Sequence, residues 1–211
     1  MTIAIIHGIF MMIFKSCNMD IDLLLNTSIN NIHSVYGGVR GTTLSSKHNM
    51  QYWKTVIESG VRTIIELRNN DHSDRLCQMC EKHGIRYFSF PMDSHSIPDE
   101  VIAAKLKEFF NIIDNGDFYI ACAMGLHRTD IALSIYWVFH GAENNISPPC
   151  LIGHFPPINE QYRPNVDSSR ILRRLNSLYD YLSLNNTIDI PDKITFTLRK
   201  KRLIYHQSPI L

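Results

Sequence analysis

The chain has 211 residues, of which 45% are hydrophobic and 19% are charged, and its formal net charge is +1. This composition excludes an intrinsically disordered chain, and the near-zero charge gives no overall field that would attract nucleic acid or an acidic membrane. The length fits one domain with a single hydrophobic core.

The N-terminal segment is apolar but short. Residues 3–14 are almost continuously apolar, and this run is too short to span a bilayer. No basic residue precedes the run and Lys15 follows it, which disfavours a secretory signal. We expect residues 1–31 to form an arm or an extra edge strand without stable membrane insertion. A secretion signal and a start codon placed too early are the alternatives.

Strand and helix patterns alternate along residues 32–184. Apolar, β-branched runs predict strands at 32–36, 61–67, 85–90 and 118–121. Helical spacing predicts helices at 49–59, at 74–82, from Pro98 to near Gly116, at 126–139 and at 167–184. This alternation predicts an α/β domain with a central, mostly parallel sheet flanked by helices. A proline-rich loop at 147–157 and a tail at 185–211, with a basic patch at 199–202, complete the chain.

The cysteines do not read as a disulfide framework. There are five without regular spacing: Cys17, Cys77, Cys80, Cys122 and Cys150. An odd, irregular set favours a reducing compartment, and therefore a cytoplasmic location. Cys77 and Cys80 form a Cys-x2-Cys pair inside a predicted helix without a second pair, so core packing is favoured over zinc binding.

The segment 122–129 carries the most informative pattern, Cys-x5-Arg-Thr between a strand and a helix. A loop that opens a helix points several backbone N–H groups at one anion, and the resulting field favours the thiolate form of Cys122. Arg128 has the planar fork that recognises phosphate, and the Thr129 hydroxyl can donate to the sulfur when it leaves. Gly125 allows a tight turn. The predicted anion cradle consists of Ala123, Met124, Gly125, Leu126, His127 and Arg128.

This loop resembles the signature of the cysteine-dependent phosphatases, His-Cys-x5-Arg-Ser/Thr, and most closely the compact dual-specificity type. The similarity lies in residues 125–129 and in the helix pattern 131–136, and it covers about residues 32–145 with a closing helix up to Leu184. It implies a cysteine-phosphatase-like fold with the phosphate loop between strand and helix. Two positions differ from the family: Ala121 replaces the usual His, which helps hold the loop and tune the thiol, and Asp130 replaces the usual Gly.

The resemblance also implies a general acid upstream of Cys122, in the loop after the preceding strand. Asp93 follows the strand pattern at 85–90 and is our expectation for this acid. Asp99 comes after Pro98, where helix capping is its natural role, and His95 is a further alternative. A solvated turn residue is the plain structural alternative for Asp93.

Four further residues have more than one interpretation. Arg68 resembles an arginine that the family carries at the end of this strand, and a structural ion pair is favoured over substrate binding. Tyr36 and Arg40 could line the rim of the site, but a core tyrosine and a surface arginine explain them equally well. His127 could touch substrate or orient the loop, or it could simply be exposed.

The sequence therefore predicts a phosphomonoester hydrolase that works through a phosphocysteine intermediate, without a metal or cofactor. The expected substrate is a phosphorylated protein or a small phosphorylated metabolite, and the lack of Lys at 123–127 disfavours highly phosphorylated inositides. The alternative is a phosphate-binding pseudophosphatase, which Ala121 and Asp130 motivate. A third interpretation, sulfur transfer from a persulfide on Cys122, would not need Asp93.

Overall fold

A computed structural model of the chain describes residues 19–46, 48–68, 73–92, 99–141, 144–147, 149, 152 and 166–185. Its helices and strands follow in chain order as α1 (Ile21–Leu25), β1 (His33–Val35), β2 (Gly38–Thr42), η1 (Asn49–Tyr52), α2 (Trp53–Glu58), β3 (Thr63–Glu66), α3 (Ser73–Lys82), β4 (Arg86–Ser89), α4 (Asp99–Asn115), β5 (Phe118–Cys122), α5 (His127–Tyr136), η2 (Trp137–Gly141) and α6 (Val166–Asn185). The short η1 is a 3-10 helix and η2 is a π-helix that continues α5. The N-terminal run 3–14, most of the proline-rich loop and the tail beyond residue 185 lie outside the described residues.

The five strands of the described part form one sheet in the order β1-β2-β5-β3-β4. β1 and β2 are an antiparallel hairpin, and the other neighbours are parallel. The predicted fold class, a mostly parallel sheet flanked by helices, is therefore confirmed. Because β5 lies in the centre, its last residue, Cys122, is flanked by Thr42 of β2, and Ala121 is flanked by Glu66 of β3. This carboxyl edge is where parallel sheets place their ligands.

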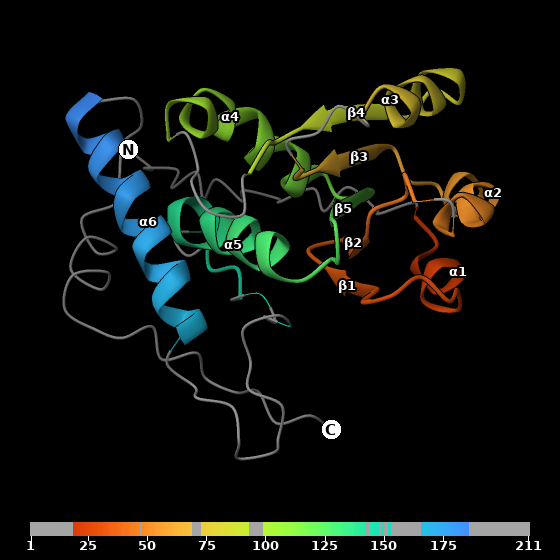
Figure 1. Ribbon diagram of the computed structural model, residues 1–211, viewed down its shortest axis with the longest axis horizontal. Coiled ribbons are helices and arrows are strands. Elements are labelled where there is room, and N and C mark those ends of the chain that lie inside the picture. Colours follow the sequence, from red (N-terminus) through yellow and green to blue (C-terminus); the bar gives the residue numbers. More distant parts are fainter. Residues whose placement is uncertain are drawn as a thin grey trace, which may run out of the picture.

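Two hydrophobic cores cover the two faces of the sheet. Successive residues of a strand point to opposite faces, so β5 contributes Phe118, Ile120 and Cys122 to one core and Tyr119 and Ala121 to the other. The first core lies under α4, α5 and α6, and the second under α1, α2 and α3 (Figure 1). The nucleophile candidate and the residue before it therefore face different layers.

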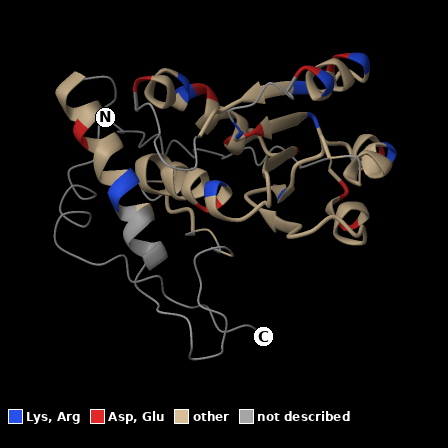
Figure 2. Cartoon of the chain, in the orientation of Figure 1, with Lys and Arg blue, Asp and Glu red and all other residues tan. Residues whose placement is uncertain are grey.

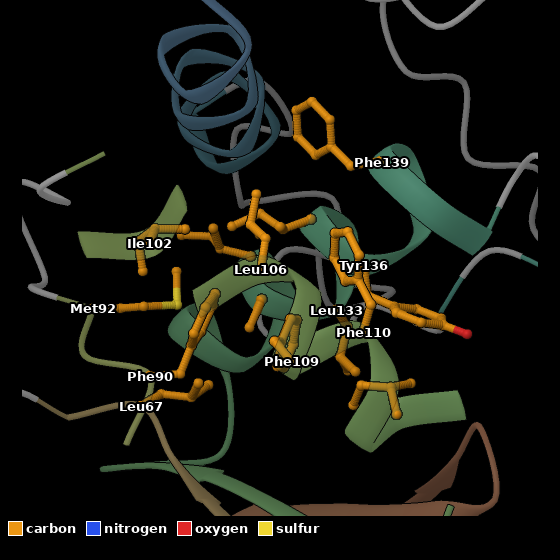
Figure 3. Packing of buried hydrophobic residues seen from close by; sticks show 14 of the residues in the cluster. Leu67, Phe90, Met92, Ile102, Leu106, Phe109, Phe110, Leu133, Tyr136 and Phe139 are labelled. Carbon is orange, nitrogen blue, oxygen red and sulfur yellow. The ribbon is translucent and has the colours of Figure 1, made fainter. Parts of the chain in front are cut away.

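Aromatic rings pack densely in the first core. The rings of Phe90 and Phe109 stack with their centroids 4.3 Å apart, and Met92 and Leu106 lie in the same cluster (Figure 3). Basic and acidic residues alternate along α3 and α4 (Figure 2), so neither helix presents a face of a single sign. No helix in the described part is long and apolar enough to cross a membrane.

The strand β2 lies outside the predicted strands, the first of which was expected to end at residue 36. Two positions of β2 need glycine because this strand lies very close to side chains and backbone of β5. A Cβ on Gly38 would lie 2.6 Å from the Phe118 carbonyl oxygen, and one on Gly41 would lie 2.3 Å from the Tyr119 hydroxyl. Glycine weakens the local strand signal while allowing this contact.

The other elements follow the predicted order with smaller differences. Gly60 and Gly84 have positive φ at the ends of α2 and α3, as expected for helix C-caps. The last predicted turn of α5 is instead the π-helix η2. Residues 19–31, expected as part of an arm, contain the short helix α1, and its Leu24 is buried in the second core.

Candidate active site

Cys122 ends the central strand at the carboxyl edge of the sheet and is only 3% exposed. Its carbonyl accepts hydrogen bonds from the backbone N–H of Thr43, at 2.9 Å, and from that of Gly125, at 3.4 Å. The first bond ties the end of β5 to the chain that leaves β2, and the second closes a turn within the loop. The thiol-bearing residue is thus fixed from both sides.

The loop between β5 and α5 turns at Gly125, which has φ of +67°. A Cβ at this position would lie 2.4 Å from the Gly41 carbonyl carbon and 2.8 Å from the Thr42 nitrogen. Both the left-handed conformation and the contact with β2 therefore require glycine. The loop therefore packs directly against β2 at Gly125.

Side chains outside the loop hold its carbonyl groups. Asn31 Nδ2 donates to the Met124 carbonyl at 2.8 Å, and Thr42 Oγ1 does so at 3.4 Å. Arg40 donates to the Gly125 carbonyl at 2.8 Å and to the Leu126 carbonyl at 3.3 Å. In a trans peptide the N–H points opposite to the C=O. Holding these carbonyls from outside therefore fixes the orientation of the peptide units that carry them, and with it the direction of the N–H groups that follow.

The helix α5 begins directly after this turn, at His127. Leu126, at its N-cap, makes no side-chain capping hydrogen bond. A helix N-terminus of this kind favours an anion through its oriented dipoles. The side chain of His127 is exposed at the start of the helix.

Arg128 is half-buried and points toward the end of β4. One of its terminal nitrogens, NH1, donates to the Met92 carbonyl at 3.4 Å. Met92 directly precedes Asp93 in the chain, so the segment of the expected general acid starts beside the arginine of the loop. Asp93 and His95 lie outside the described residues, and Asp99 begins α4 with no description of its side chain.

Thr129 is fully buried, and within the described residues its hydroxyl has no hydrogen-bond partner. A buried hydroxyl without a partner costs about 1–3 kcal/mol. That cost is consistent with a functional use of the donor, such as the predicted hydrogen bond to the Cys122 sulfur.

Arg40 and Asp130 form a buried ion pair that sequence analysis missed. Arg40 NH2 lies 2.6 Å from Asp130 Oδ1, and the two side chains are 1% and 0% exposed. The interpretations of Arg40 as a rim or a surface residue are therefore wrong. Asp130 was the available signal, because an acid within the buried part of a helix needs a cationic partner.

A second polar network surrounds Glu66, which lies beside Ala121 on the neighbouring strand β3. Glu66 accepts from Arg68 Nε at 2.8 Å and from Thr43 Oγ1 at 2.9 Å. The predicted structural ion pair of Arg68 is thus confirmed. Thr43 is also the residue whose N–H holds the Cys122 carbonyl, so this network supports the site at the strand end where the histidine is missing.

Two further expectations concern Tyr36 and the Cys77–Cys80 pair. Tyr36 packs on the ring of Tyr136 with centroids 4.9 Å apart, which supports its interpretation as a packing residue. The expected core packing is confirmed for Cys80, which is buried in the second core, and is wrong for Cys77, which is exposed on α3. No group of His, Cys, Asp or Glu in the described ranges is suited to hold a metal ion.

No family model matches the chain, and no curated protein matches it. Among solved structures, a putative phosphatase from Shewanella putrefaciens is 16% identical, with coverage of 76% of this chain and 97% of that chain and a TM-score of 0.51. TpbA from P. aeruginosa is 14% identical, covers 82% and 92%, and has a TM-score of 0.44. The core catalytic domain of the PP-IP phosphatase SIW14 from S. cerevisiae is 14% identical, covers 77% and 96%, and has a TM-score of 0.43.

The similarity to the Shewanella structure shows the fold. The chain shares with that structure a mostly parallel five-stranded sheet flanked by helices. In this chain the Cys-x5-Arg loop lies at the carboxyl edge of the central strand.

Proposed function

We propose that the chain is a cysteine-dependent phosphomonoester hydrolase of the dual-specificity-like type. The observation that carries this proposal is the loop after β5. It starts at Cys122, its carbonyls at Met124, Gly125 and Leu126 are held from outside, and it leads into α5, whose second residue, Arg128, donates to the Met92 carbonyl. A nucleophile at the mouth of an anion-binding loop is the arrangement that phosphoryl transfer to cysteine needs.

The reaction has two steps. In the first, the Cys122 thiolate attacks phosphorus, the bond to the ester oxygen breaks, and Asp93 gives a proton to the departing oxygen. In the second, Asp93 takes a proton from water as the water attacks the phosphocysteine, and the products are phosphate and the thiolate. Backbone N–H groups of 123–128 and the Arg128 guanidinium stabilise the equatorial oxygens. Thr129 stabilises the thiolate as it leaves.

The substrate of this proposal is a phosphorylated protein or a small phosphorylated metabolite. The loop residues 123–127 contribute no Lys or Arg, and the side chain of Met124 is exposed. Such a loop suits a single phosphoryl group better than a highly phosphorylated inositide, for which additional cations would be useful.

A phosphate-binding pseudophosphatase remains the second candidate because Ala121 replaces the usual histidine. Its other motivation was the negative charge of Asp130 near the loop. The Arg40 guanidinium lies 2.6 Å from that carboxylate and offsets its charge, which removes one of the two reasons for this alternative.

The nucleophile is tested by hydrolysis of an aryl phosphate with a chelator present. We expect the wild type to be active and Cys122→Ser to lose about 10³-fold or more, because the attacking group is removed. The matched control is Cys77→Ser, an exposed cysteine on α3, which should keep full activity. Equal activity of Cys122→Ser, or loss of turnover on chelation, would contradict the mechanism.

The general acid is tested by the dependence of rate on the leaving group. Asp93→Asn should slow alkyl phosphates by about 10²–10⁴-fold and activated aryl phosphates much less, because only a poor leaving group needs the proton. The high-pH limb of kcat/KM should also disappear. Asp99→Asn is the control and should behave as the wild type. An equal loss on every substrate would point to a folding role for Asp93, and the effect in Asp99→Asn instead would transfer the assignment.

A further inference from the structure

The buried pair Arg40–Asp130 connects the centre of the sheet to the phosphate loop. Arg40 lies on β2 and Asp130 in the first turn of α5, and the NH2 nitrogen of Arg40 contacts Asp130 Oδ1 and the carbonyls of Gly125 and Leu126. The backbone N–H of Asp130 also donates to the Leu126 carbonyl.

We propose that Arg40 and Asp130 are positioning residues for anion binding, which orient the N–H groups of Leu126 and His127 toward a bound phosphoryl group. This inference rests on the proposed function of the loop. Because C=O and N–H are antiparallel across a trans peptide, holding the Gly125 carbonyl sets the direction of the Leu126 N–H. Holding the Leu126 carbonyl sets the direction of the His127 N–H in the same way.

Asp130 contributes to this positioning because its carboxylate binds the Arg40 guanidinium. Its carboxylate is fully buried and also accepts from the backbone N–H of Ile152 at 3.2 Å. The Asp130 N–H donates to the Leu126 carbonyl at 2.9 Å, so the carboxylate that holds Arg40 is part of the same helical turn as the peptide that Arg40 orients. The position of Arg40 is therefore coupled directly to the geometry of the loop.

The pair should affect the phosphoryl oxygens and not the leaving group. It lies on β2 and α5, whereas the expected acid Asp93 follows β4. A weakened cradle lowers the affinity for every tetrahedral dianion and slows every phosphate ester by a similar factor. This signature differs from that of a general acid, whose loss depends on the leaving group.

The test measures tungstate binding by calorimetry and thermal unfolding of the same samples. The central variant is Arg40→Met/Asp130→Leu, which removes both buried charges together and leaves neither unpaired. The matched control is Arg86→Met/Glu108→Leu, an exposed pair with an N–O distance of 2.7 Å. We expect the tungstate Kd to rise about tenfold or more in the buried-pair variant and to stay unchanged in the control.

Arg40→Lys is the second variant, in case the double variant does not fold. Lysine keeps the charge, but its shorter side chain does not place a nitrogen where Arg40 NH2 contacts the carboxylate and both carbonyls, so the Kd should rise here as well. On aryl and alkyl phosphates, kcat/KM should fall by the same factor. A folded variant of either kind with wild-type tungstate affinity overturns the proposal.

The two proposals fail separately. A wild type that binds tungstate but hydrolyses no ester would refute the phosphatase, and the Kd shift in the variants would still support the positioning role. A wild type that binds no tungstate would overturn the positioning role itself, because there would be no anion cradle to orient.

Discussion

At the scale of single residues, Gly125 is where the loop comes closest to the sheet. We expect Gly125→Ala to destabilise the fold by about 2–5 kcal/mol, since it adds both left-handed backbone strain and overlap with β2. The Cβ would lie 2.4 Å from the Gly41 carbonyl carbon, so the loop must move and the proposed phosphatase activity should be lost. Urea unfolding and aryl phosphate turnover measure the two effects.

Gly84→Ala is the matched control for this substitution. Gly84 has nearly the same φ, +66°, but a Cβ there would have nothing within 4 Å. It precedes β4 and so lies at the edge of the sheet opposite the loop. The cost should be about 1–2 kcal/mol with unchanged activity. A Gly125→Ala variant that is as stable and as active as Gly84→Ala would contradict the close packing of the loop.

Residues of the loop could be predicted from sequence because their chemistry is local. Cys122, Gly125 and Arg128 stand at fixed spacing between a strand pattern and a helix pattern. The role of Arg40 could not be found this way, since its contact with Asp130 depends on β2 lying beside β5. The hydrophobic pattern of β2 or of β5 does not specify that the two strands are neighbours, because strand order is set by how the whole sheet packs.

At the scale of elements, α6 covers α4 and α5 with one apolar stripe. Ile171, Leu175, Leu178 and Leu182 recur at helical spacing and are buried in the first core. We expect Leu175→Ala to lower the free energy of unfolding by about 2–5 kcal/mol, because it leaves a cavity between the helices. Leu184→Ala is the control: this side chain is 84% exposed, and its loss should cost less than about 0.5 kcal/mol.

The comparison of Leu175→Ala with Leu184→Ala by urea unfolding also tests the position of α6. Equal midpoints in the two variants would show that α6 does not pack on α4 and α5. The helix itself was predictable, because an amphipathic pattern of this length is a strong signal. The strand β2 was not, because its glycines are explained only by the Phe118 and Tyr119 groups that they approach.

At the scale of the whole molecule, the second core makes stability sensitive to alkaline pH. Burial, with a smaller effect of the nearby Cys77, raises the pKa of the Cys80 thiol to about 12 from an ordinary value of 9.0. Burial is also the largest cause that raises the pKa of Tyr87, to about 12 from 10.0. Both groups therefore hold their protons to higher pH in the folded state than in the unfolded state.

We expect the free energy of unfolding to fall as pH rises above about 9, because there the unfolded chain releases the Cys80 proton and the folded chain keeps it. The contribution of Cys80 is fully present below that pH and declines by up to about 1.4 kcal/mol per pH unit above it. Urea midpoints between pH 7 and 10 measure the slope, and Cys80→Ala should reduce it most clearly around pH 9, where unfolded-state tyrosines, with an ordinary pKa of 10.0, are still mostly protonated. Cys77→Ala, an exposed control on the same helix, should keep the wild-type slope. The same alkaline slope in Cys80→Ala and in the wild type would show that another group controls this loss of stability.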